Sequence, residues 1–170
     1  LAENAHYNAL LLGDGSRLTR QDLGLTLAGE GADCRLKGVS LAKGDQHLDT
    51  SVILEHQVPN AHSDQQFKSV LAKGARSVFQ GLVKVAHGAE GTEAHQKSNN
   101  LLLDRSAEAD AKPELEIFAD DVQCTHGATV GEIDEASLFY LKSRGLDDAT
   151  ARALLVQGFV AEMFDDIADE

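Results

Sequence analysis

The chain has 170 residues, a formal net charge of −13 and no tryptophan. This length can bury one sizeable hydrophobic core, with a helical appendage in addition. The acidic balance argues against a nucleic-acid-binding face and against binding to an anionic membrane, because both need basic surface. Hydrophobic residues make up 42% of the chain, which is too many for disorder.

The chain has two cysteines, Cys34 and Cys124, which lie far apart in the sequence. A disulfide framework needs more cysteines at closer spacing, so we expect reduced thiols and a cytoplasmic protein. No apolar run approaches the ~20 residues that span a bilayer. Residues 1–12 lack the basic start and the cleavage site of a signal peptide. The chain opens on Leu1 rather than Met, as a fragment of a longer protein would.

Short apolar runs separated by glycine-containing turns fill residues 8–132. We predict strands within 9–12, 23–28, 34–37, 39–41, 50–54, 67–71, 78–86, 99–103 and 115–124. Strands with a turn signal every ~8–12 residues are typical of an all-β sandwich, barrel or solenoid, and no helical pattern separates them for parallel crossovers. Runs without a polar opposite face, such as 52–54, favour a solenoid, although no fixed residue repeats at a fixed period.

The pattern becomes helical at Asp134, which can cap a helix that begins at Glu135. Arg144-Gly145 ends this helix, and a second helix begins at Asp147 or Asp148. Its apolar stripe consists of Ala151, Leu154, Leu155, Phe159, Met163 and Ile167. We therefore expect a β body at 1–132 and a helical segment at 133–170, which packs on the body or on a partner protein.

Four motifs lie between Pro113 and Gly145. They are Pro113-Glu114-Leu115-Glu116-Ile117, Ala119-Asp120-Asp121-Val122, Cys124-Thr125-His126-Gly127-Ala128-Thr129 and Leu138-Phe139-Tyr140-Leu141-Lys142-Ser143-Arg144-Gly145. Together they resemble the SufB/SufD family, the scaffold proteins of the SUF iron–sulfur cluster assembly system. The helical stretch 151–162 and looser upstream matches extend the resemblance over most of the chain. The form at 126–129 is similar to the SufD branch; the SufB branch has a Glu-His-Glu-Ala-Thr type of sequence there and an upstream cysteine that we cannot place here.

This resemblance implies a right-handed parallel β-helix, or β-solenoid, followed by a short C-terminal α-helical segment. It implies a non-catalytic SufD-like subunit that pairs with a SufB-like scaffold protein and docks a SufC-like ATPase, which would carry the ATPase activity. No cofactor would be stably bound; an iron–sulfur cluster would form transiently at the shared interface. The position of His126 is similar to that of the histidine that the SufD branch contributes to this interface.

The residues themselves give a weaker indication of metal binding. Cys124 and His126 are two apart, so they point the same way on a strand. A thiolate and an imidazole can bind iron, but two ligands are too few without a partner chain. The alternative is a buried cysteine and a hydrogen-bonded histidine. Cys34 is expected in the core. The pairs His56/His62 and His87/His95 fit no known metal-site spacing.

We expect the ATPase to dock on the helical segment, or the same residues to pack against the β body. The predicted docking residues are Leu138, Phe139, Tyr140, Leu141, Arg144, Gly145, Leu154, Leu155 and Phe159. No P-loop lysine and no Gly-x-Ser-x-Gly motif is present. Two other functions stay open: a β-solenoid protein–protein interaction module with no metal chemistry, and a metal-dependent hydrolase. Exposed strand edges also make a homodimer plausible.

Overall fold

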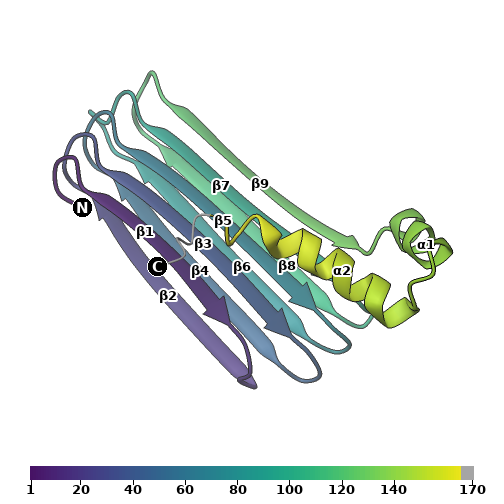
Figure 1. The fold of residues 1–170 in the computed structure, drawn as a ribbon. Helices are drawn as coiled ribbons and strands as arrows, with labels where there is room; N and C mark the ends of the chain where they lie inside the picture. The colour runs from purple at the N-terminus through teal and green to yellow at the C-terminus, as the bar shows by residue number, and fades with distance from the viewer. Residues whose placement is uncertain (166–170) are drawn as a thin grey trace.

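The computed structural model describes residues 1–165. Nine strands precede two helices, and successive strands lie on alternate sides of the molecule (Figure 1). The elements are β1 (His6–Gly13), β2 (Leu18–Leu27), β3 (Asp33–Ala42), β4 (His47–His56), β5 (His62–Leu71), β6 (Arg76–Val85), β7 (Glu93–Leu102), β8 (Glu108–Ile117), β9 (Gln123–Glu132), α1 (Glu135–Ser143) and α2 (Asp148–Ala161).

The strands form two parallel sheets, which we call sheet A (β1-β3-β5-β7-β9) and sheet B (β2-β4-β6-β8). Each coil of the chain contributes one strand to each sheet, so the molecule is a β-solenoid. This confirms the predicted fold class and selects the solenoid among the alternatives. Parallel neighbours need no crossover helix here, because the chain reaches the next coil by way of the opposite sheet.

Side chains that point inward from the two sheets form the core. Leu36, Val52, Phe67 and Phe79 pack together in its middle. A β-carbon on Gly38 would lie 2.4 Å from the Phe67 ring, so only glycine leaves room for this aromatic side chain. Cys34 is completely buried, as predicted for a core residue, and burial raises the pKa of its thiol to about 11.

One turn of each coil contains a residue in the left-handed backbone region. These residues are Asn4, Gly31, Asn60, Gly91 and Asp121, with φ angles between 52° and 70°. They stack on one another: the Asn60 amide donates to the Glu90 carbonyl, and the Gly91 amide to the Asp121 carbonyl. The column marks a repeat of about one coil, carried by Gly, Asn or Asp, the residues that tolerate this conformation.

The two helices begin as predicted. The carboxylate of Asp134 accepts hydrogen bonds from the backbone N–H of Ala136 and Ser137, and that of Asp147 accepts one from Thr150. α1 ends at Arg144, followed by Gly145 with φ +95°. α2 ends at Ala161, so it is shorter than the apolar stripe indicates, and Ile167 lies outside the described residues. No helix within residues 1–165 is long and apolar enough to cross a membrane.

The predicted strand at 115–124 is wrong. β8 ends at Ile117, the chain turns at Asp121, and a separate strand begins at Gln123. The apolar alternation misled the prediction because Ala119 and Val122 in the turn pack against the same buried cluster as Leu115. As a result, Cys124–Gly127 opens the last strand and does not lie at a strand end next to the helices.

Candidate functional site

The candidate site lies on β9, the last strand of sheet A. β9 pairs with β7 on one side and forms an edge of the sheet on the other. In this pairing Cys124 is opposite Ala94, and His126 is opposite Gln96. Both partners are buried and point inward, so Cys124 and His126 also point to the inside of the solenoid, at its open end.

Cys124 is only partly exposed. It packs against a buried cluster that contains Val83, Val85 and Ala94. Burial raises the pKa of its thiol, and a hydrogen bond from the Ala94 backbone offsets this only in part. Iron binds the thiolate, so the burial that protects Cys124 also works against its use as a ligand.

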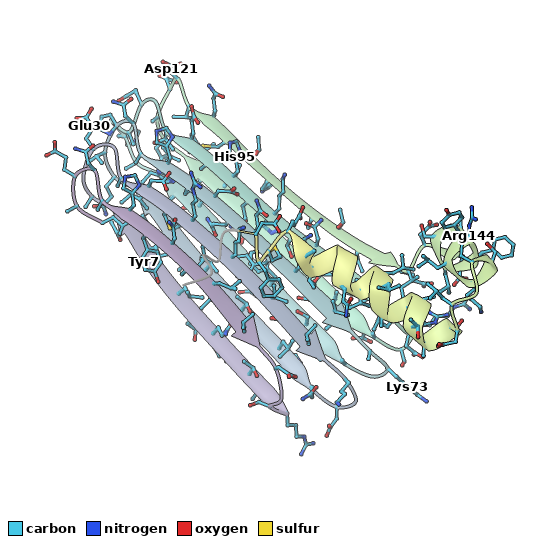
Figure 2. All side chains as sticks on the ribbon, viewed as in Figure 1. Tyr7, Glu30, Lys73, His95, Asp121 and Arg144 are labelled. Carbon is cyan, nitrogen blue, oxygen red and sulfur yellow. The ribbon has the colours of Figure 1, made fainter. Side chains whose placement is uncertain are left out.

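His126 is exposed, because no further strand covers this end of the solenoid. The next residue back, Thr125, points to the outer face of the sheet. There its hydroxyl lies 2.8 Å from Nδ1 of His95, on β7 (Figure 2). The edge strand is thus held to its neighbour by side chains on the outer face, while His126 stays accessible on the inner one.

The other histidines do not gather into a metal site. His56 is fully buried, with Nε2 2.9 Å from the Ser63 hydroxyl, whereas His62 lies on the surface with Nδ1 3.6 Å from Glu93. His87 is exposed and packs beside the ring of Phe118. Within residues 1–165, no group of three or more His, Cys, Asp or Glu side chains is arranged to hold a metal ion. The hydrolase hypothesis therefore has no candidate centre in this part of the chain.

The predicted docking residues fall into two sets. Leu138 is buried, and Leu141, Leu155 and Phe159 are partly buried against the cluster that joins the helices to sheet A. The remaining residues of the set, Phe139, Tyr140, Arg144, Gly145 and Leu154, are exposed. Phe139 is 74% exposed, and Arg144 lies over the ring of Tyr140 (Figure 2). The first set fixes the helices, and the second leaves an apolar surface with one cation.

Lys68 on β5 fastens the end of α2 to the outer face of sheet A. It is 8% exposed, and its ammonium donates a 2.6 Å hydrogen bond to the Phe159 carbonyl and pairs with the Glu162 carboxylate. The ammonium also lies 4.9 Å from the centre of the Phe159 ring. The sequence analysis missed this contact, because a lysine in a strand is ordinarily solvent-exposed.

We expect Lys68→Met to lower the free energy of unfolding by about 1.5 kcal/mol. The substitution keeps the buried stem but removes a charge-assisted hydrogen bond; the ion pair with the exposed Glu162 adds little. Urea denaturation measures the loss. Lys84→Met is the matched control, since Lys84 forms a 3.5 Å surface ion pair with Glu116. Equal losses in the two variants would mean that Lys68 does not fasten α2.

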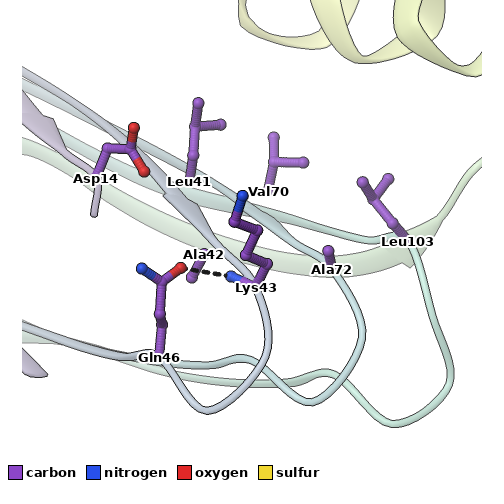
Figure 3. Close-up of a pocket in the computed structure, with 8 residues that line it drawn as sticks. All are labelled: Asp14, Leu41, Ala42, Lys43, Gln46, Val70, Ala72 and Leu103. Carbon is purple, nitrogen blue, oxygen red and sulfur yellow. Dashed lines mark hydrogen bonds between the residues drawn. The ribbon is translucent and has the colours of Figure 1, made fainter. Parts of the chain in front are cut away.

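A groove of about 310 Å³ lies elsewhere on the molecule (Figure 3). It is lined by Asp14, Leu41, Ala42, Lys43, Gln46, Val70, Ala72 and Leu103. Leu41 is five residues further along its strand than the register position of His126, which corresponds to roughly 15 Å. The groove is therefore separate from the candidate site.

Comparisons with known proteins identify relatives over nearly the whole chain. The family described as "SUF system FeS cluster assembly, SufBD core domain" matches residues 1–159. The chain is 38% identical to the iron-sulfur cluster assembly protein SufD of Escherichia coli, in an alignment that covers 100% of the chain and 40% of that protein. It is 34% identical to a SufBD family protein of Synechocystis, over 97% of the chain and 36% of the relative.

A third relative is a SufBD family protein of Mycobacterium bovis, 40% identical over 86% of the chain and 17% of the relative's length. The chain thus spans two fifths or less of these three curated relatives. The likeness bears directly on the part of the relatives that carries the solenoid and the two helices.

Proposed function

The chain belongs to the SufBD family of SUF iron–sulfur cluster assembly proteins, and on this basis we propose that it acts as a SufD-like scaffold subunit. It pairs with a SufB-like chain through the open end of the solenoid, and His126 takes part in assembly of the nascent cluster. The observation that carries this proposal is an exposed histidine on the inner side of an edge strand.

The edge of β9 supports pairing with a second chain. An edge strand presents a row of unpaired backbone N–H and C=O groups, which another strand can satisfy. β8 is the corresponding edge of sheet B, so both sheets are open at the same end. A partner that continues both sheets covers Cys124 and His126 at once.

The chemistry follows from the ligand types. A neutral imidazole nitrogen binds iron, and thiolate ligands bind iron–sulfur clusters. His126 offers its nitrogen without competition from burial, whereas Cys124 must first lose the proton that its surroundings retain. The partner chain supplies the remaining ligands. The cluster is the cargo of this site and leaves it after assembly.

The exposed side chains of the helical segment support docking of a SufC-like ATPase. Phe139, Tyr140 and Leu154 present apolar surface, and Arg144 adds a cation next to it. Exposed aromatic and arginine side chains are the types that dominate protein–protein contacts. In this proposal ATP hydrolysis resides in the ATPase, and the scaffold chain is not itself an enzyme.

Hydrogen–deuterium exchange of the full-length chain tests the pairing. We expect a SufB-like partner to protect the amides of 108–117 and 123–132, and a SufC-like ATPase to protect 135–161. The amides of β4, in the middle of sheet B, are the internal control, since they are already paired on both sides. A stable complex that leaves β9 unprotected would contradict pairing through this edge. Protection of β9 without any cluster formation would favour an interaction module with no metal chemistry.

A further inference from the structure

A column of polar side chains leads from the core to His126. Gln65 on β5, Gln96 on β7 and His126 on β9 occupy the same register position in sheet A and point inward. The residue before them in this column, Leu36 on β3, is apolar and buried. Two buried amides directly behind an exposed histidine are unusual, because a solenoid interior is otherwise filled most cheaply by apolar side chains.

Gln96 is the middle member, and its amide is only half satisfied. The side chain is 1% exposed, and its Nε2 donates a 3.2 Å hydrogen bond to Oε1 of Gln65. Its own Oε1 is buried without a hydrogen-bond partner among the described residues. A buried acceptor without a donor destabilises the fold, so such a group calls for an explanation.

The opposite sheet confines this amide. A β-carbon on Gly81 of β6 would lie 2.4 Å from Nε2 of Gln96 and 2.7 Å from its Oε1. The amide thus lies against bare backbone, and the hydrogen bond to Gln65 fixes its second direction. Gln96 is therefore held in place, with an acceptor left over, one strand away from His126.

We propose that Gln96 is a positioning residue for His126, which rests on the proposed function of this histidine. Neighbouring strands are about 5 Å apart, so an imidazole at this position lies within reach of the amide behind it. When a partner covers the open end, the ring N–H of His126 donates to Oε1 of Gln96. The proton then stays on the inward nitrogen, and the lone pair of the other nitrogen faces the partner chain and its iron.

This arrangement matches a general requirement for histidine ligands. The nitrogen that does not bind metal ordinarily donates its proton to a carbonyl or carboxylate oxygen, which fixes the tautomer and the ring orientation. An amide oxygen supplies this acceptor without adding a charge. The donated hydrogen bond also satisfies the buried oxygen of Gln96, which the free chain leaves unpaired.

The test measures the tautomer of His126 directly, independently of cluster formation. Long-range proton–nitrogen NMR spectra of the full-length chain, labelled at the histidine ring nitrogens and bound to a SufB-like partner, give the ratio of the two neutral tautomers. We expect Gln96→Met to change this ratio by about threefold to tenfold, the range that one neutral hydrogen bond supplies. Gln96→Glu retains an acceptor, to which the unpaired Nε2 of Gln65 can donate, so it preserves the wild-type preference.

Asn100→Leu is the matched control. Asn100 is also a buried amide on β7, but its register partner is Val130 rather than His126. We expect this variant to lose stability without a change in the tautomer ratio. An unchanged ratio in Gln96→Met, or equal changes in both variants, would overturn the positioning role. If Gln96→Met shifts the ratio while His126→Ala still assembles clusters, the contact exists and the proposed function of His126 fails.

Discussion

Replacing His126 with alanine in the full-length chain is expected to reduce iron–sulfur cluster assembly in cells by more than tenfold. This is a lower bound, since even changes in the groups that surround a metal ligand cost about 10–100-fold in metal affinity or activity. The fold should be unaffected, because His126 is exposed on an edge strand and fills no cavity in the free chain. Activity of a cluster-dependent reporter enzyme, in cells that lack the endogenous protein, measures the effect.

Thr125→Val is the control for this prediction. It removes the contact with His95 from the outer face of the same strand, one residue away, and leaves the inner face intact. We expect this variant to assemble clusters at close to the wild-type rate. Full assembly by His126→Ala, or an equal loss in both variants, would mean that β9 matters only as a structural edge.

The second large effect concerns stability in acid and comes from His56. Burial lowers the pKa of its ring from 6.5 to about 4, with a smaller contribution from nearby His62. Below 6.5 the unfolded chain binds a proton at this ring and the folded chain does not, so stability falls as the pH falls. The loss grows between 6.5 and about 4, levels off below that, and reaches about 3 kcal/mol.

Urea denaturation across this pH range measures the effect. His56→Gln removes the titrating ring, so its stability should depend less on pH than that of the wild-type chain, even though it starts lower because the contact with Ser63 changes. His87→Gln, at an exposed position, should follow the wild-type curve. Parallel curves for wild type and His56→Gln would show that the ring is protonated in the folded protein.

The β-rich body and the helix starts could be predicted from local chemistry. Asp134 and Asp147 cap the helices as their positions indicate, because capping depends only on a short side chain and the next three residues. The end of α2 could not be predicted in the same way. Met163 continues the apolar stripe and is buried, yet it lies beyond the helix, since tertiary packing buries it without helical backbone.

The coil repeat escaped the sequence analysis for a physical reason. What repeats is a left-handed backbone conformation, and Asn4, Gly31, Asn60, Gly91 and Asp121 meet this requirement with three different side chains. A search for one residue at one period cannot detect it. A search for any of Gly, Asn or Asp at intervals close to 30 residues could have done so, and would also have separated β8 from β9 at Asp121.

The candidate site was predictable only in part. The spacing of Cys124 and His126 placed both on one face, and the resemblance to the SufB/SufD family singled out His126. Neither could reveal Gln96, because its importance depends on parallel register between strands that are 30 residues apart. Lys68 was missed for a similar reason, since its partners lie in a helix that packs on the strand from a distant part of the chain.

The visible absorbance of the assembled complex tests the central claim most directly. The full-length chain is mixed with SufB-like and SufC-like partners, iron and sulfide, with either wild-type His126 or His126→Ala. We predict cluster absorbance in the wild-type complex, none in either scaffold protein alone, and a strong reduction in the variant complex of the same mass. Undiminished cluster absorbance in the His126→Ala complex would contradict a role for this histidine at a shared interface.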